Sequence, residues 1–318
     1  APTVPAIEVR FVPQEQTALQ LWRSGAVDVV QGAPPTQYDL FQREAPDQLH
    51  LTPSGAWEHL AFNLEHPILK DVRVRRAIAH LIDRHQLNTK AYGGVQLPAW
   101  SELPTTHWAY PRGVEKRYVP DPEAVARLLD EAGWKPGPDG MRRRGSEELA
   151  LSLLTTSEKP SRSLAAQIFQ RQWREAGIAL TIEKQPASLV FGSAESGGRM
   201  ASGDFALALV SSFSRPDPDA TFRWRSDQVP PHGQNRSRYR NAKVDGWLEA
   251  GQRTLDRAER KRIYGRIAER LITDLPVLPL LYWVDVDATR PRLSGFKPNP
   301  TLRGNLWNVW EWKLVNPS

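Results

Sequence analysis

Residues 60–83 read LAFNLEHPILKDVRVRRAIAHLID, and they join a short extended segment at 60–63 to an amphipathic helix. Asp71 is expected to cap this helix, because its carboxylate can accept hydrogen bonds from amide groups of the first turn. Apolar residues then recur at helical spacing: Val74, Ala77, Ile78, Leu81 and Ile82. The pattern predicts a core helix, whose outer, solvated face is expected to carry Arg73, Arg75 and Arg76.

Extended and helical patterns alternate along the rest of the chain. Expected strands cover residues 7–12, 27–30, 49–51, 149–154, 178–183, 205–210, 277–286 and 308–314. Expected helices cover residues 14–24, 38–43, 121–133, 162–176, 244–251 and 256–273. This alternation is typical of an α/β protein, and we expect mostly parallel strand pairing. The first 30 residues predict a βαβ-like unit, and the apolar run at 205–210 predicts a central strand buried on both faces.

One long segment shows neither helical nor strand periodicity. Residues 93–120 are rich in Pro, Gly and Trp, and a loop of this length inside a compact domain is usually functional or wraps a surface. Four of its residues are expected to line a cleft: Trp100, His107, Trp108 and Tyr110.

Composition limits the function classes. The 318 residues carry a formal net charge of +6, and the arginines are spread over many segments instead of forming one basic face with stacking aromatics. No nucleic-acid partner is therefore expected. The chain has no cysteine, which excludes thiol catalysis, thiolate metal sites and disulfides. No apolar run approaches the length of a membrane span, and no signal peptide opens the sequence, so an export signal is expected to lie outside it.

Motifs for catalysis or metal binding are missing. There is no G-x-S-x-G elbow, no H-E-x-x-H pair and no glycine-rich phosphate loop. His80 and His85 are five residues apart, which does not place them on one helical face. We expect no enzyme activity, no cofactor and no protein-bound metal, although a metal chelate stays open as a ligand.

An ordered set of short motifs resembles one family. The first group follows residue 61 and comprises Phe62-Asn63, Pro67, Asp71, Arg73-Val74-Arg75, Ala77 and Asp83-Arg84. Further matches are residues 118–122, Leu128-Leu129, residues 132–134, Gly177-Ile178, residues 203–205, residues 217–219, residues 241–245, Gly295-Phe296, Asn299-Pro300 and Trp310. Together they resemble the family 5 extracellular solute-binding proteins, the peptide- and nickel-binding components of ABC importers.

This resemblance implies an α/β fold of the periplasmic-binding-protein-like type II class, a two-lobed clamp. Residues 1–60 and 290–318 would belong to lobe I, and residues 61–289 would form the second lobe. The segments 57–62 and 284–290 would be hinge strands. Motif order also places Ile7 well inside a normal member, so the clamp is expected to be incomplete at the N-terminus, with the missing N-terminal portion of the same protein as a partner.

The resemblance also implies a ligand site. In peptide-binding members, the stretch after the central strand pairs its main chain with the ligand backbone, and here that stretch is Ser211, Ser212, Phe213, Ser214 and Arg215. Those members hold the ligand α-amino group with an Asp where this chain has Ser214, so Asp217 or Asp219 would have to substitute. Asp217-Pro218 can equally build only a turn. Trp57 would pack on ligand or in the core.

The function implied is that of a binding component which captures a peptide or similar small solute in an interlobe cleft and delivers it to an ABC permease in the membrane. Its expected location is periplasmic or extracellular, associated with the membrane. The same fold also serves as the ligand-sensing domain of some transcription regulators, and this alternative stays open. A hydrolase is a more distant third class.

Overall fold

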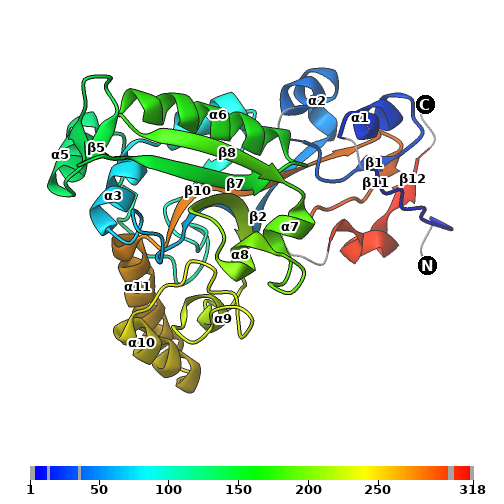
Figure 1. The fold of residues 1–318 in the computed structure, drawn as a ribbon. Coiled ribbons are helices and arrows are strands. Elements are labelled where there is room, and N and C mark those ends of the chain that lie inside the picture. The colour runs from blue at the N-terminus through cyan, green and yellow to red at the C-terminus, as the bar shows by residue number, and fades with distance from the viewer. Residues whose placement is uncertain (1–3, 13–14, 35–36, 116, 300–303, 316–318) are drawn as a thin grey trace. The chain divides into compact units, whose positions relative to one another are not determined.

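The computed structural model describes residues 4–12, 15–34, 37–115, 117–299 and 304–315 (Figure 1). By its contacts the chain forms two compact units. Unit 1 contains residues 1–55, 92–97 and 282–318, and unit 2 contains residues 56–91 and 98–281. The sequence predicts lobe boundaries after residues 60 and 289, and it places residues 92–97 in the second lobe. In the described ranges, no helix has the length and apolar character needed to span a membrane.

Unit 2 is built on a mixed sheet in which the order of strands is β10, β2, β9, β7 and β8. These strands are β2 (Leu49–Phe62), β7 (Ala150–Thr156), β8 (Ala179–Gln185), β9 (Leu207–Phe213) and β10 (Val277–Thr289). β7 runs parallel to both β8 and β9, whereas β9 pairs antiparallel with β2. The expectation of mostly parallel pairing is therefore wrong for the β2–β9 half of the sheet. There the 14-residue strand β2 runs in the direction opposite to β9.

One long helix covers β7 and β8. Helix α6 (Pro160–Glu175) lies over these strands (Figure 1), and Phe169 and Trp173 on it stack with ring centroids 5.8 Å apart. Both aromatic side chains are almost completely buried. The predicted central strand is also confirmed, since every residue from Phe205 to Val210 is buried. Burial on both faces explains why this stretch is a continuous apolar run and does not alternate.

The helix predicted from the opening stretch is confirmed as α3 (Val72–His80). The carboxylate of Asp71 accepts a hydrogen bond from the amide of Arg73 at 2.9 Å and thereby caps it. Arg75 contradicts the prediction of a wholly basic outer face, because only 5% of it is exposed. Its guanidinium donates to the carbonyl oxygens of Leu69, at 2.6 Å, and of Asp274. The long side chain thus satisfies carbonyl groups inside the unit.

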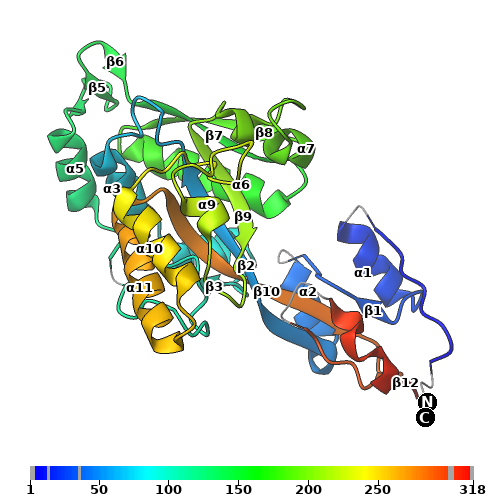
Figure 2. The ribbon, with the colours of Figure 1, turned by 90° about the horizontal axis from the view of Figure 1, so that it is seen from below.

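Unit 2 contains seven further described helices. They are α4 (Arg84–Ala91), α5 (Pro122–Glu131), α7 (Ala187–Phe191), α8 (Arg199–Ser202), α9 (Thr221–Trp224), α10 (Ala242–Arg253) and α11 (Arg257–Asp274). Helix α5 packs on α3, and α10 lies beside α11 (Figure 2). A small antiparallel sheet contains β4 (Lys135–Pro136), β5 (Arg142–Arg144) and β6 (Glu147–Glu148).

Unit 1 contains a smaller core. Its elements are α1 (Glu15–Arg23), β1 (Val29–Val30), α2 (Tyr38–Glu44), the 3-10 helices Pro46–Gln48 and Asn305–Glu311, β11 (Leu293–Ser294) and β12 (Lys313–Leu314). Strand β3 (Leu97–Pro98) lies at its boundary with unit 2. β1 pairs with the end of β10, and Trp22 packs edge-on against Phe41.

Two expected strands are wrong. Residues 7–12 form no strand, and Phe11 within them is 94% exposed, so the βαβ-like unit lacks its first strand. Alternating apolar residues predict a strand only where an edge is available to pair with, and no described segment pairs with them. The expected strand at 308–314 is mostly the 3-10 helix Asn305–Glu311, and only β12 is extended.

Candidate functional site

Strand β9 extends beyond one of its two neighbours. Its pairing with β2 continues to its last residue, where Phe213 lies opposite Ala56. Its pairing with β7 ends where Leu209 lies opposite Thr155. The end of β9 therefore has a paired edge toward β2 and an edge that β7 does not cover.

The direction of the backbone groups follows from one hydrogen bond. The amide of Asn63 donates to the carbonyl oxygen of Ala206 at 3.0 Å, so the backbone N–H and C=O groups of Ala206 point toward β2. The backbone N–H and C=O groups of successive residues point to alternate sides of a strand. Those of Ser212 therefore also point toward β2, whereas those of Ser211 and Phe213 point the other way. The unbroken register supports this assignment. The N–H groups of Ser211 and Phe213 thus point to the edge that β7 leaves uncovered.

The segment after β9 is held by the long loop that precedes it in the sequence. Ser214 donates its hydroxyl to the carbonyl oxygen of Glu102. The carbonyl oxygen of Pro216 accepts from His107 Nε2 at 3.0 Å and from Trp108 Nε1 at 3.1 Å. His107 and Trp108, predicted to line a cleft, therefore fix the backbone that follows the open edge. Of the other two, Trp100 stacks under Arg84, and Tyr110 donates to Glu115.

Glu102 is the buried acid at this position. Its carboxylate accepts from Trp224 Nε1 at 2.8 Å and from Arg223 Nη1 at 3.2 Å. Burial raises the pKa of Glu102, and the hydrogen bonds and charge of Arg223 oppose that rise. A second guanidinium nitrogen of Arg223 donates to the carbonyl oxygen of Phe213 at 3.3 Å. Arg223 thereby ties the end of β9 to Glu102.

The predicted acidic substitutes for a ligand-binding Asp are already engaged. Asp217 forms a bidentate pair with Arg260, with both N–O distances 2.8 Å, and these hydrogen bonds lower the pKa of Asp217. Asp219 accepts from the amide and hydroxyl of Thr221 and from Gln252. The two carboxylates therefore build this segment.

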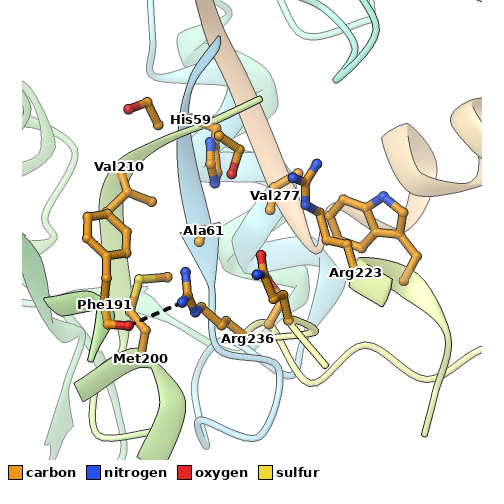
Figure 3. Close-up of a pocket in the computed structure, with 13 residues that line it drawn as sticks. His59, Ala61, Phe191, Met200, Val210, Arg223, Arg236 and Val277 are labelled. Atoms are coloured by element: carbon orange, nitrogen blue, oxygen red, sulfur yellow. Dashed lines mark hydrogen bonds between the residues drawn. The ribbon is translucent and has the colours of Figure 1, made fainter. Parts of the chain in front are cut away.

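A cavity of about 40 Å³ lies on one face of the sheet, beside the end of β9 (Figure 3). It is lined by His59, Ala61, Phe191, Met200, Val210, Ser211, Ser212, Arg223, Trp224, Gln234, Arg236, Ser237 and Val277. The lining thus includes two arginines and no carboxylate. Figure 3 shows Arg236 reaching toward Phe191, whose carbonyl oxygen accepts from it at 3.3 Å.

His59 forms part of the wall of this cavity. His59 is buried, and its ring lies against that of Trp57 in a tilted arrangement with ring centroids 4.2 Å apart. Burial above all, together with the positive charges of Arg223, Arg162 and Arg236, lowers the pKa of His59 to about 3. The ring is neutral at physiological pH.

Trp57 lies below the surface of the site. None of its side chain is exposed, and among the described residues its Nε1 has no hydrogen-bond partner. The guanidinium of Arg223 lies over its ring at 5.7 Å from the centroid. Arg223 and His59 therefore cover the ring that was predicted to pack on ligand or in the core.

The opposite face of the sheet carries a buried ion pair. Arg162 on α6 donates to both carboxylate oxygens of Glu58 on β2, at 2.6 and 3.1 Å. It also donates to the hydroxyls of Thr156 at the end of β7, at 2.8 Å, and of Ser211 on β9, at 2.7 Å. One side chain thus links the three strands that meet where β9 becomes uncovered.

Apart from Trp57, the predicted site residues line two hollows, and Arg223 belongs to the lining of both. Ser211 and Ser212 line the cavity described above. A second hollow of about 10 Å³ is lined by the other members of the segment, Phe213, Ser214, Arg215 and Asp217, together with Glu102 and Arg223. Arg215 stacks over Phe222.

Sequence reasoning missed Glu58, Glu102, Arg162, Arg223 and Arg236. The only signal for Arg236 is its place in the run NRSRYRN, and charged runs are usually solvated. In the described ranges, no three His, Asp or Glu side chains lie close enough together to hold a metal ion.

Comparison with known proteins identifies the family. Residues 1–230 match the model described as "Bacterial extracellular solute-binding proteins, family 5 Middle". A similar curated protein is Protein XP55 of Streptomyces lividans, 27% identical over 275 residues, which are 86% of this chain and 48% of that protein. Oligopeptide-binding protein AppA of Bacillus subtilis (strain 168) is 21% identical over 316 residues, which are 99% of this chain and 57% of AppA. The chain spans about half the length of these relatives.

Solved structures show the same fold. The structure of AppA from Bacillus subtilis in complex with a nonapeptide matches with a TM-score of 0.83 and 22% identity, over 96% of this chain and 59% of that one. NikA from Brucella suis, in complex with Fe(III)-EDTA, matches with a TM-score of 0.83 and 22% identity, over 96% of this chain and 61% of that one. The chain has the α/β fold of the type II periplasmic binding proteins, and it belongs to family 5 of the bacterial extracellular solute-binding proteins.

Proposed function

We propose that this chain is part of the binding component of an ABC importer, which captures a peptide or a similar small solute and delivers it to a membrane permease. The family match supports this function over the alternative of a regulator's sensing domain. We also propose that unit 1 contributes to lobe I, that unit 2 is the second lobe, and that the protein works in the periplasm or outside the cell, associated with the membrane.

One observation carries the peptide part of this proposal. The N–H groups of Ser211 and Phe213 point to an edge of β9 that β7 does not cover. An extended ligand can add to such an edge through main-chain hydrogen bonds, which give affinity without requiring a particular ligand side chain. Arg162, Arg223 and Glu102 hold this edge in place from both faces.

Replacement of Phe213 by proline tests the edge. Proline has no N–H, so the variant loses one donor toward the ligand, and we expect peptide binding to weaken about tenfold. Native mass spectrometry after incubation with a defined mixture of tri- to pentapeptides measures the retained fraction. Phe213→Ala is the matched control, because it removes the same ring and keeps the N–H.

Ser212→Pro separates ligand binding from folding. Its N–H faces β2, so this variant loses a bond of the sheet, and we expect a lower melting temperature than for Phe213→Pro. If folded Phe213→Pro retains peptides as well as Phe213→Ala does, the uncovered edge of β9 does not bind the ligand backbone.

A further inference from the structure

Arg236 is a partly buried cation that forms no ion pair with an acid among the residues that the structure describes. Its Nη2 donates to the carbonyl oxygen of Phe191 at 3.3 Å, and its guanidinium lies over the ring of that residue at 5.4 Å. Its Nε is buried and has no hydrogen-bond partner among the residues that the structure describes. Burial and the neighbouring Arg223 both lower the pKa of Arg236.

Several other arginines of the unit are paired with acids. Arg162 is paired with Glu58, Arg238 with Glu65 and Arg260 with Asp217. Arg223, the other cation of the cavity, is paired with Glu102. Buried or partly buried charges are costly unless they are paired, so the position of Arg236 favours a counter-ion supplied from outside the chain.

The cavity fits a small planar anion. At about 40 Å³ it has room for a few water molecules by the same measure, and hence for a terminal group of a ligand, not for a whole residue. A planar guanidinium matches a carboxylate in shape and hydrogen-bonding geometry. Ser212 and Gln234 add polar side chains to the lining, and the uncovered edge of β9 lies at its rim.

We propose that Arg236, next to Arg223, binds a carboxylate group of the solute whose main chain pairs with β9. This inference rests on the proposed function and adds that the solute is recognised by an anionic group. It also agrees with the state of the nearby acids, since Glu102, Asp217 and Asp219 all have partners within the protein. The site is therefore matched to an anionic group of the ligand and not to its free amino group.

The anion site can be tested without a peptide. Melting temperatures of the full chain are measured in chloride and in acetate at equal ionic strength, with acetate as the carboxylate probe. We expect acetate to raise the melting temperature of the wild type more than that of Arg236→Gln, because a ligand that binds the folded state stabilises it. Arg171→Gln removes the same charge from an exposed position on α6 and should respond like the wild type. Equal acetate responses of the wild type and Arg236→Gln would overturn the carboxylate site.

A second measurement uses paired probes, a mixture of tripeptides with free carboxyl termini and the same mixture as C-terminal amides. We expect the wild type to bind the free acids at least tenfold more tightly than the amides, and Arg236→Gln to lose this preference. Equal binding of both mixtures by the wild type would overturn the carboxylate site for peptide termini and leave the binding function intact. Binding of neither mixture, together with an acetate response that depends on Arg236, would contradict peptide capture and support the carboxylate site.

Discussion

Replacement of Arg162 by methionine is expected to lower the free energy of unfolding by about 3 to 5 kcal/mol. Only 4% of the Arg162 side chain is exposed, and none of the Glu58 side chain is exposed. Removal of the guanidinium leaves the Glu58 carboxylate buried without its countercharge, and it also removes the donor to Thr156 and Ser211. Urea-induced unfolding measures the change.

Two further variants test the cause of this loss. In the double variant Glu58→Leu, Arg162→Met neither charge of this pair remains buried, so we expect much of the stability to return. Arg171→Gln, on the exposed side of the same helix, should change stability by less than about 0.5 kcal/mol. A single variant Arg162→Met as stable as Arg171→Gln would show that the ion pair does not hold the three strands together.

Stability at acidic pH is expected to depend on His59. Its pKa is about 3 in the folded chain, against an ordinary value of 6.5. Between these two values the unfolded chain binds a proton that the folded chain does not, so the free energy of unfolding falls as the pH falls from 6.5 toward 3. At 1.36 kcal/mol per pK unit, the full contribution amounts to about 4 to 5 kcal/mol.

His59→Gln removes this contribution, and unfolding measured across that pH range should show a flatter curve than for the wild type. Groups with raised pKa values, such as Glu102 and Asp285, act with the opposite sign in both proteins and cancel in the comparison. His232→Gln, at an exposed position, should leave the wild-type slope unchanged. Parallel curves for the wild type and His59→Gln would show that His59 is protonated in the folded chain as readily as in the unfolded one.

Local features of the fold could be predicted because they depend on neighbours in the sequence. Asp71 lies directly before α3 and caps it, and the apolar run at 205–210 marks a strand with both faces covered. The family motifs predict the segment 211–217, and in the structure residues 211–213 form the uncovered end of β9 while residues 214–217 follow it. Its role in ligand binding stays a prediction.

Partners far apart in the sequence could not be predicted. Arg162 meets Glu58 across 104 positions, and Arg75 meets the carbonyl oxygen of Asp274 across 199 positions. Nothing in the residues next to Arg75 distinguishes it from a solvated arginine, because its burial depends on carbonyl groups that only the folded chain brings near. Strand direction was missed for a similar reason, since β2 and β9 pair antiparallel over a long separation.

Amide hydrogen exchange at β9 tests the central claim most directly. Exchange at Ser211 and Phe213 is measured in the full chain, alone and with the free-acid tripeptide mixture. Because we propose that these two N–H groups donate to the ligand backbone, we expect their exchange to slow on addition of peptide. Exchange at Ser212, whose N–H points toward β2, should change little. Peptide binding with unchanged exchange at both Ser211 and Phe213 would contradict ligand pairing at this edge.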